Sequence, residues 1–373
     1  MKTSIIPYTL ILIGVTLWGC SSNTVNNSDE SLDFYEFKEG EPKTLPEGLS
    51  KRVEYINLKS QNPDLDFKYL TKALIKGDSI FLLDALMSNK LLLYDRQTGN
   101  AISAIGTRGN GPNEYARLCD FDVDSSGKIF VLDANLDKLF TYNIDLTIDR
   151  VISSPYDADA LKVLHNGNIL LGLSSWNKKK CSGDRVILVD HNLDYIKTLL
   201  KYDDSFDDSY WFSFYSFSTI GNTIQYNRPT DNSLYSFDLE GNLIDKLVID
   251  FGDREAPKKI KQDIERNLDA INTQYSILVG SLISFSDYIF GTLRDRGKTR
   301  PFILDCNNKV CHYFKERWEG DLSMTLSFQD NLWISYLTPG DNNLDLNNYP
   351  QSVRENLANE NFTLCIRTLN SDQ

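Results

Sequence analysis

The sequence predicts an all-β fold assembled from repeated units of about four short strands each. A strand-turn-strand phrase recurs along the chain, most clearly at 128–133 followed by 138–143, and earlier at 79–84 followed by 90–95. An Asp or Asn closes the second strand of each phrase, and intervals of 48, 47, 48 and 67 residues separate Asp95, Asn143, Asp190, Asp238 and Asp305. The last interval is one ordinary period of 48 plus an excess of 19. A period of about 50 residues is typical of a β-propeller blade.

Six such units account for the chain after its N-terminal part, so we expect a six-bladed β-propeller. In chain order, the units cover residues 67–105, 120–152, 160–201, 212–250, 276–314 and 323–369. Each unit consists of short runs of β-branched and aromatic residues separated by turns rich in Gly, Asn and Asp. That alternation is the pattern of antiparallel strands joined by tight turns.

The sixth unit is one strand short at its C-terminal end. Residues 53–58, which precede the first unit, form a spare strand in which apolar residues alternate with polar ones. We expect this strand to complete the last blade and close the ring, because an unpaired terminal strand would leave an open sheet edge.

Two segments interrupt the repeat. Residues 254–273 follow a helical spacing, with apolar residues at Ile260, Ile264, Leu268 and Ile271 after Pro257. This pattern predicts one amphipathic helix and accounts for the 19-residue excess. Residues 350–359 form a second helical candidate inside the sixth unit.

The N-terminus has the features of a secretory signal. Lys2 precedes an apolar run over 5–16 that is too short to span a bilayer. The run ends in Leu17-Trp-Gly-Cys20, which resembles a lipobox, so we expect lipidation at Cys20; the alternative is ordinary signal cleavage beside an incidental Cys. We therefore expect a signal peptide over 1–20, a Ser/Asn-rich flexible tether over 21–50, and a single propeller domain over 51–373. Acyl chains on Cys20 would anchor the protein at a membrane without crossing it.

Charge and cysteine content narrow the classes of partner. The formal net charge of −13 argues against nucleic acid, since phosphate binding needs a cationic surface. The five cysteines after Cys20 are odd in number and scattered, which is not a disulfide scaffold. Cys306 and Cys311 flank a turn, and the pair is either a disulfide in an oxidising periplasm or two free thiols.

The junction between the first and second units carries a family resemblance. Residues 105–115 read Ile-Gly-Thr-Arg-Gly-Asn-Gly-Pro-Asn-Glu-Tyr. This resembles the six-bladed, TolB-like propeller lipoproteins of Gram-negative gut bacteria, relatives of NHL-type propellers, which tend to have Gly-x-Gly-Pro-Gly-Glu-Tyr here. Asn113 stands where the third Gly is common, and we expect it to keep the turn because Asn tolerates a left-handed backbone.

The resemblance implies a fold and a location, and it does not indicate an activity. It implies an outer-membrane lipoprotein of the cell envelope. Ser21-Ser-Asn-Thr24 lacks the acidic run that would indicate surface export, so we expect the periplasmic side.

One loop face of the propeller is the expected ligand site, because function often lies on rigidly mounted loops. Loops that join one unit to the next, or the second strand to the third, collect Arg and aromatic residues. Arg offers paired donors to a carboxylate or phosphate, and Trp or Tyr can stack on a sugar ring. The alternative is that the Arg residues pair with neighbouring Asp and Glu, that Glu114 caps backbone amides and that Tyr115 packs between blades. The candidates are Arg108, Asn113, Glu114, Tyr115, Arg117, Trp176, Trp211, Arg228, Asp231, Arg294, Arg296 and Trp318.

Signatures of catalysis are absent from the sequence. The three histidines form no His-x-x-x-His pair, and no Gly-x-Ser-x-Gly elbow or phosphate loop occurs. We therefore expect a monomeric, non-catalytic protein without a cofactor. Its expected partner is a small polar or anionic molecule, such as a sugar or peptide, or an envelope protein.

Two other functions stay open. A Ca²⁺-dependent lactonase or lyase would use Asp84, Asp133 and Asp231 as ligands. The alternative for Asp84 and Asp133 is the common role of an Asp at a strand end, which is to accept hydrogen bonds from turn amides. A protein-interaction scaffold would use the propeller rim or the helical segment 254–273.

Overall fold

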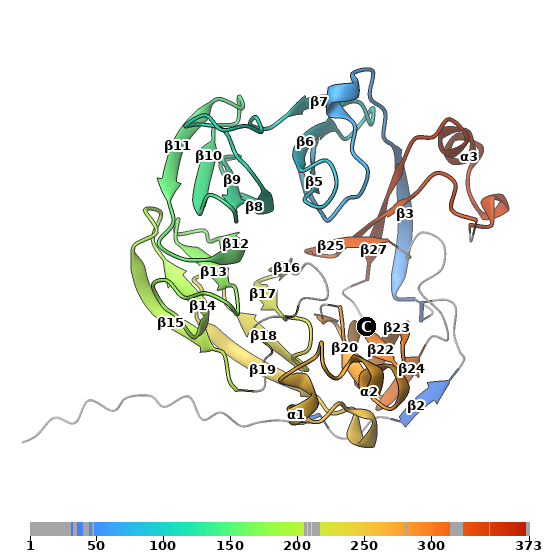
Figure 1. Ribbon diagram of the computed structural model, residues 1–373. Coiled ribbons are helices and arrows are strands. Elements are labelled where there is room, and N and C mark those ends of the chain that lie inside the picture. The colour runs from blue at the N-terminus through green and yellow to red at the C-terminus, as the bar shows by residue number, and fades with distance from the viewer. Residues whose placement is uncertain are drawn as a thin grey trace, which may run out of the picture.

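Small antiparallel sheets arranged around a ring form the molecule (Figure 1). The computed structural model describes residues 31–32, 36–39, 45–46, 48–204, 207, 210, 217–280, 282–313, 324–342 and 344–370. Over these residues the chain is all-β with a few short helices, and the arrangement is propeller-like, as the repeat predicts.

Three four-stranded sheets follow one another along the chain, and each strand pairs antiparallel with the next. The first contains β4 (Lys72–Lys76), β5 (Ser79–Asp84), β6 (Lys90–Asp95) and β7 (Ala101–Ala104). The second contains β8 (Leu118–Val123), β9 (Ile129–Asp133), β10 (Lys138–Tyr142) and β11 (Ile148–Ser153). The third contains β12 (Ala158–Val163), β13 (Ile169–Leu173), β14 (Asp184–Val189) and β15 (Tyr195–Lys201).

A fourth separate sheet joins a later part of the chain to an N-terminal strand. It contains β20 (Ser276–Leu278), β21 (Ile283–Phe285), β22 (Tyr288–Asp295), β23 (Lys298–Asp305) and β24 (Val310–Tyr313). Strand β2 (Glu36–Glu39) adds to its outer edge, parallel to β24.

The remaining strands make one nine-stranded sheet. One group contains β16 (Ser218–Ile220), β17 (Thr223–Tyr226), β18 (Ser233–Phe237) and β19 (Leu243–Ile249), with β1 (Ser31–Leu32) beside β19. The other contains β25 (Thr325–Gln329), β26 (Leu332–Leu337), β27 (Thr363–Leu369) and β3 (Ser50–Asn57). A single parallel bridge, Thr219 opposite Gln329, joins the two groups. Strand pairing therefore gives four separate blade-like sheets rather than the six expected, because β16 reaches β25 and merges two groups.

The expected N-terminal closing strand is present. β3 pairs antiparallel with β27, with Val53 opposite Arg367 and Asn57 opposite Thr363. This confirms that a strand from before the first repeat completes the last set of strands.

Both helical expectations are confirmed, the first in a modified form. Instead of one helix, residues 254–273 hold two short helices, α1 (Lys258–Lys261) and α2 (Leu268–Thr273), and the 3-10 turn η2 (Gly252–Arg254) precedes them. Ile264 and Ile271 are buried there against Ile277. Helix α3 (Gln351–Ala358) begins after Pro350, and single 3-10 turns lie at η1 (Pro63–Leu65) and η4 (Leu346–Asn348).

Two strands, β1 and β2, lie within the range 21–50 that was expected to be a flexible tether. Both pair with the outer edges of sheets. Open edges offer unpaired backbone groups that an extended segment can bind, which a composition-based reading of the segment does not reveal. The expected signal peptide and Cys20 lie outside the described residues. In the described part of the chain, no helix is long and apolar enough to cross a membrane.

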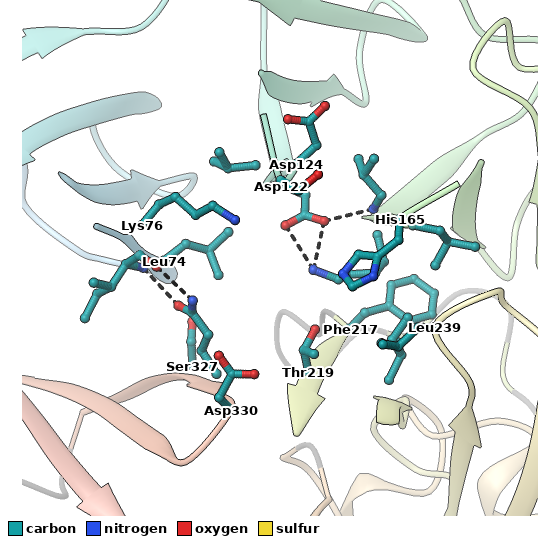
Figure 2. A pocket seen from close by; sticks show the side chains of 18 of the residues that line it. Leu74, Lys76, Asp122, Asp124, His165, Phe217, Thr219, Leu239, Ser327 and Asp330 are labelled. Atoms are coloured by element: carbon teal, nitrogen blue, oxygen red, sulfur yellow. Dashed lines mark hydrogen bonds and ion pairs between the residues drawn. The ribbon is translucent and has the colours of Figure 1, made fainter. Parts of the chain in front are cut away.

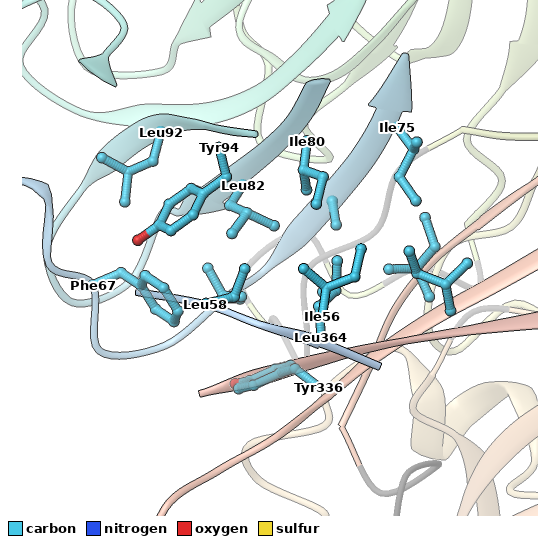
Figure 3. Packing of buried hydrophobic residues seen from close by; sticks show 14 residues of the cluster. Ile56, Leu58, Phe67, Ile75, Ile80, Leu82, Leu92, Tyr94, Tyr336 and Leu364 are labelled. Atoms are coloured by element: carbon cyan, nitrogen blue, oxygen red, sulfur yellow. The ribbon is translucent and has the colours of Figure 1, made fainter. Parts of the chain in front are cut away.

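Apolar clusters lie between successive sheets and hold the ring together. The cluster in Figure 3 packs Ile80 and Leu82 of β5 against Ile56 of β3 and Leu364 of β27. Phe67 and Tyr94 meet edge to face in the same cluster, with ring centroids 6.4 Å apart. The first sheet is thus packed on the strands that close the ring.

Side chains from one sheet satisfy the backbone of the next sheet's edge strand. The carboxylate of Asp120 accepts a hydrogen bond from the Leu161 amide at 2.9 Å, and that of Asp122 accepts one from Val163 at 2.8 Å. The same arrangement joins β25 to β4, where Ser327 Oγ accepts from the Ala73 amide at 3.1 Å. Because alternate residues of a strand face the same way, donors two residues apart meet acceptors two residues apart.

The side chains of Gln329 and Gln225 also bond to the backbone of a neighbouring sheet's edge strand. Gln329 Oε1 accepts from Ile75 at 2.9 Å, and its Nε2 donates to the Ile75 carbonyl at 2.8 Å. Gln225 Oε1 accepts from the Ser284 amide at 2.9 Å. These bonds satisfy edge groups that would otherwise be buried without partners.

A buried ion pair belongs to this system. Lys72 Nζ lies 2.7 Å from Asp120 Oδ1, with side chains 7% and 2% exposed, and it donates to the Phe121 carbonyl at 2.7 Å. Burial raises the pKa of Asp120, and the ammonium of Lys72 opposes that shift. Two desolvated charges stabilise each other only when their remaining hydrogen bonds are made. Here Lys72 also donates to the Phe121 carbonyl, and Asp120 also accepts from the Leu161 amide.

We expect Asp120→Ala to lower the free energy of unfolding by about 3–5 kcal/mol, because it leaves the Lys72 charge buried without its partner. The Leu161 amide also loses its acceptor. Guanidinium unfolding followed by tryptophan fluorescence measures the change.

The matched control is Glu54→Ala, which breaks a pair with Arg96 whose side chains are about one third exposed. Its unfolding midpoint should stay close to that of the wild type, since exposed pairs contribute little. Equal losses in the two variants would contradict a special role for the buried pair. Replacing both Lys72 and Asp120 by apolar residues should recover part of the loss.

Candidate functional site

A cavity of about 170 Å³ opens where the edge strands of several sheets meet. Its walls come from β4, β8, β12, β16, β17 and β25 and from the turns that follow them. The lining residues are Lys72, Leu74, Ile75, Lys76, Asp122, Val123, Asp124, Ser125, Lys162, Val163, Leu164, His165, Phe217, Thr219, Ile224, Leu239, Ser327, Phe328, Gln329 and Asp330. Of the twelve residues predicted from the loops, the ten that the structure describes do not line it.

The cavity lies at the end of the strands opposite to the predicted loop face. Its turn residues, such as Asp124, His165 and Asp330, follow the first strand of a set. In an antiparallel sheet, the turn after the first strand and the turn after the second lie at opposite ends. The predicted loops follow the second strand or join sets, so they belong to the other face.

One wall of the cavity is an ion pair. Lys162 Nζ lies 3.0 Å from Asp122 Oδ2, and the same carboxylate accepts the Val163 amide at 2.8 Å (Figure 2). Asp122 is buried, whereas the Lys162 side chain is 18% exposed. Lys162 is therefore within reach of the cavity while its charge is balanced.

Three chargeable side chains at the cavity, those of Lys76, His165 and Asp330, form no such ion pair among the described residues. Lys76 ends β4 and is exposed, and its ammonium points toward the centre of the cavity (Figure 2). His165 and Asp330 occupy turns after β12 and β25, and both are exposed. Among the residues that the structure describes, neither Lys76 nor Asp330 forms an ion pair. Two nitrogen groups and one carboxylate are thus available to a ligand.

The backbone fixes where these groups stand. The Asp330 amide donates to the Thr219 carbonyl at 2.6 Å, and Asp330 has φ of 53° in the turn before β26. Asp124 is already used, since its Oδ1 accepts from the Ser126 and Lys128 amides at 2.8 and 2.9 Å. Asp330 is therefore oriented by its turn while its carboxylate is left for solvent or ligand.

An apolar surface completes the site. Phe217 and Leu239 lie beside His165 (Figure 2), and both belong, with Ile224, to the cluster between the third sheet and β17–β19. Phe217 packs against Tyr226 with ring centroids 4.9 Å apart. The volume is below the roughly 300–1,000 Å³ of pockets that hold drug-sized ligands, so a ligand that fits is small.

The sequence contained a usable signal for this site that the loop-based prediction overlooked. Lys76 and Asp124 stand 48 residues apart, at the end of the first strand in successive units. Reading that one position across every unit would have collected Lys76, Asp124, His165 and Asp330.

Asp84 has the structural role that the sequence favoured over metal binding. Its carboxylate accepts hydrogen bonds from the amides of Lys68, Tyr69, Met87 and Ser88 at 2.8–3.1 Å. Burial acts to raise the pKa of Asp84, but these hydrogen bonds outweigh it and the pKa lies below its usual value.

Asp133 has the same role, accepting from Ala116, Arg117, Asn135 and Leu136 amides at 2.6–3.2 Å. Within the described residues, no group of three or more His, Cys, Asp and Glu side chains is placed to hold a metal ion.

The Gly-Pro-Asn-Glu-Tyr loop is held by its own side chains. Glu114 Oε2 accepts from the Gly111 amide at 2.7 Å, and a Cβ at Gly109 would lie 2.0 Å from that oxygen. Tyr115 is 2% exposed and packs between the first two sheets. The expected turn is kept at Pro112 and Asn113, where the Glu114 amide donates to the Gly111 carbonyl at 3.1 Å, but Asn113 has no positive φ, so the turn does not need a left-handed backbone there.

Arg228 is buried in a network of protein contacts. It is 4% exposed and donates to the Leu173 carbonyl and the Ser175 hydroxyl, both at 3.1 Å. It also bonds to the Tyr202 hydroxyl and lies 3.8 Å from a carboxylate oxygen of Asp159. The structure therefore gives this predicted residue a role in joining the third sheet to β17–β18.

Asp231 lies beside Arg228 and is paired with a different arginine. Its carboxylate forms an ion pair with Arg185 and accepts the Ser233 amide at 3.0 Å. The Arg185 guanidinium lies over the rings of Tyr226 and Tyr235, 5.2 and 5.1 Å from their centroids. Arg228 and Asp231 thus share one turn, in which the Asp231 amide donates to the Arg228 carbonyl at 3.1 Å.

The other predicted residues are spread over the surface. Arg294 donates to Asn272 Oδ1 at 2.8 Å, and Arg296 lies 3.4 Å from Asp295 in a turn. Trp176 is 43% exposed. Arg108, Asn113 and Arg117 are exposed, and Trp211 and Trp318 lie outside the described residues.

Cys306 and Cys311 are free thiols, which settles the alternative left by the sequence. Burial is the main cause that raises the pKa of Cys306 to about 11. Cys311 is 1% exposed and packs in the core of its sheet.

Comparison with known proteins shows a family and a fold. The sequence profile of a family described as “Domain of unknown function (DUF4934)” matches residues 31–361. No curated protein matches the chain significantly in sequence. The chain resembles the crystal structure of a Bacteroides fragilis protein described as a “Putative exported protein”, with a TM-score of 0.69 and 16% identity over 86% of this chain and 95% of that one. At this identity the likeness supports the fold alone.

Two further structures are less similar. One is a member of the duf4221 family from Bacteroides vulgatus, with a TM-score of 0.46, 11% identity and coverage of 86% of this chain and 97% of that one. The other is virginiamycin B lyase from Staphylococcus aureus, with a TM-score of 0.45, 10% identity and coverage of 86% and 99%. Scores this low carry no argument about function.

We expect the stability of the protein to fall in alkali partly through Tyr115. Burial raises its pKa to about 12, against about 10 in an unfolded chain. The folded protein therefore holds the phenol proton more tightly, and this contribution is complete below about pH 10 and lost as the pH rises through about 12. Tyr115→Phe should reduce the loss of the denaturant midpoint between these values.

The control is Tyr195→Phe, at a residue that is 42% exposed. It should leave the alkaline profile of the wild type unchanged. The same profile in wild type and Tyr115→Phe would contradict a contribution from Tyr115.

Proposed function

Because a match over residues 31–361 makes the chain a member of the DUF4934 family, whose description assigns no activity, we propose a function from the cavity itself. The protein binds a small polar ligand that carries an acidic group, and it does so without catalysis. The observation that carries this proposal is the ammonium of Lys76, which points into the cavity and forms no ion pair with any described residue.

The ligand class follows from the groups around the cavity. Lys76 and His165 offer donors to a carboxylate or a similar anion, and Lys162 adds a third nitrogen that is shared with Asp122. Asp330 and Thr219 can accept hydrogen bonds from hydroxyl or amino groups. The apolar surface of Phe217 suits a sugar ring or a short aliphatic part. An acidic sugar or a small peptide fragment meets all three requirements.

The architecture and location that accompany this function are also proposed. The strands 218–249 and 325–369, joined by one bridge, act as two blades, which gives six with the four separate sheets and fits a TolB-like or NHL-like propeller. The apolar run before Cys20 and the exported description of the B. fragilis protein support an envelope location. Lipidation of Cys20 would hold the monomer at the periplasmic side of the outer membrane.

The ligand proposal is tested by a thermal-shift screen with acidic and neutral monosaccharides, single sugar units of peptidoglycan and di- and tripeptides, which are small enough for the cavity. A ligand of the native state raises the melting temperature. For the best compound, Lys76→Ala should weaken binding about ten- to hundredfold, since a hydrogen bond to a charged group contributes roughly 1.5–3 kcal/mol. Isothermal titration calorimetry measures the affinity.

Two controls separate the cavity from other sites. Lys201→Ala removes an exposed charge at the end of β15, away from the cavity lining, and should leave the affinity unchanged. Arg108→Ala tests the loop face predicted from sequence. Loss of binding in Arg108→Ala with full binding in Lys76→Ala would reject the cavity. Stabilisation by Ca²⁺ alone that disappears in Asp231→Ala would favour the metal-dependent enzyme, and no shift with any compound would favour a protein scaffold.

The anchor is tested by metabolic labelling with a radioactive fatty acid in a Gram-negative host. We expect the wild type to incorporate label and to fractionate with membranes, and Cys20→Ser to do neither. Cys119→Ser serves as the control for cysteine substitution and should label normally. Equal labelling of wild type and Cys20→Ser would reject lipidation at this residue.

A further inference from the structure

The outer edge of β24 differs from the outer edges of the other strand sets. β7, β11, β15, β19 and β3 each show a shift in register against the neighbouring strand. β24 pairs with β23 in an unbroken register, from Phe302 opposite Tyr313 to Asp305 opposite Val310. It is therefore the regular edge among these six.

Regular and irregular edges behave differently toward other strands. A bulge bends the strand and increases its twist, so the edge fits a new strand poorly. A straight edge presents a row of unpaired N–H and C=O groups, which is a template for a further strand. Of these six edges, β24 is therefore the one most suited to pair with a further strand.

Two N-terminal strands, β1 and β2, each pair with the outer edge of a sheet, and the longer one, β2, lies on β24. β2 pairs in parallel with the full length of β24, from Glu36 opposite Val310 to Glu39 opposite Tyr313. β1 pairs with only two residues of β19, Val248 and Ile249. The longer N-terminal strand thus lies on the edge that is regular in register.

β24 is held in place independently of its cover. Cys311 is 1% exposed and packs with Phe302 and Leu304 in the core of the sheet. Removal of β2 would therefore leave β24 on β23 with an open edge.

The linker to β3 decides how strongly β2 competes for this position. Five residues, 40–44, separate β2 from Leu45, which packs against the core cluster of Leu49 and Trp333, and these five can extend over at most about 18 Å. A short tether of this kind gives an effective concentration of about millimolar. The same residues of another molecule, with the same sequence and register, can replace β2 when it detaches or when the local concentration is comparable.

We propose that the outer edge of β24 is a strand-docking site, filled by β2 of the same molecule and able to accept residues 36–39 of a second copy of this chain. This surface is separate from the cavity and does not depend on the ligand proposed for it.

The test uses hydrogen exchange on the full chain carrying Phe37→Pro and Lys38→Pro together. Adjacent residues of a strand direct their N–H groups to opposite sides, so one of the two prolines removes a donor toward β24. We expect the amides of 310–313 that face β2 to lose protection, while those of 302–305 keep it. A synthetic peptide of residues 31–41, added at about 1 mM to match the tethered concentration, should restore the lost protection.

Two controls accompany this experiment. Val25→Pro with Asn26→Pro places the same number of prolines before β1 and should leave protection at β24 unchanged. A peptide that carries the prolines at 37 and 38 should restore nothing.

Three results would overturn the proposal. Unchanged protection at 310–313 in the double variant would show that β2 is not the cover. Loss at 302–305 as well would show that β2 supports the whole sheet rather than covering an edge. A self-associated variant whose β24 protection is insensitive to the peptide would show that bare edges pair with one another instead of accepting residues 36–39.

Discussion

The ring depends on hydrogen bonds between side chains of one sheet and the backbone of the next sheet's edge strand. An edge strand in the interior of a ring has amides that neither water nor a neighbouring strand can satisfy fully. Asp120 and Asp122 on β8 supply acceptors for β12, and Ser327 and Gln329 on β25 supply them for β4. Apolar clusters between sheets supply packing, but these directed bonds set the register of each sheet against its neighbour.

The same alternation along the strands produces the cavity. Lys72, Leu74 and Lys76 follow one another at every second residue of β4. Lys72, deeper in the structure, is paired with Asp120, whereas Lys76, at the strand end, has no ion-pair partner among the described residues. On β8, Asp122 meets Lys162, and Asp124, just past the strand, caps its own turn. The site is therefore the place where the inter-sheet pairing system ends and its last charged groups are left unmatched.

The fold was largely readable from the sequence because its signals are local or periodic. Turn-capping by Asp84 and Asp133, the closing strand over 50–57 and the helix after Pro350 all follow from short patterns. The number of separate sheets was not readable, because the bridge between Thr219 and Gln329 joins residues that are far apart in the chain.

The site was harder to predict for the same physical reason. Arg228 resembles a ligand-binding residue in a loop, yet its partners Leu173 and Tyr202 belong to the preceding unit and cannot be recognised from spacing. Conversely, His165 and Asp330 occupy ordinary turns and become a candidate site only when the ring brings those turns together. Asn113 was expected to tolerate a left-handed backbone because of its residue type, and the turn is kept there without a positive φ.

Closure by β3 and β27 also constrains the order in which the molecule can form. Thr363 and Asn57, which are hydrogen-bonded across this seam, are 306 residues apart in the chain. During N-to-C synthesis β3 is made well before its partner β27, and contacts of such large separation form slowly. The partly made chain is therefore an open arc with an unpaired strand at one end, a state in which edge strands are prone to aggregate. A holding factor that covers unpaired strand edges would have its greatest effect on β3 in this interval, before the seam is closed.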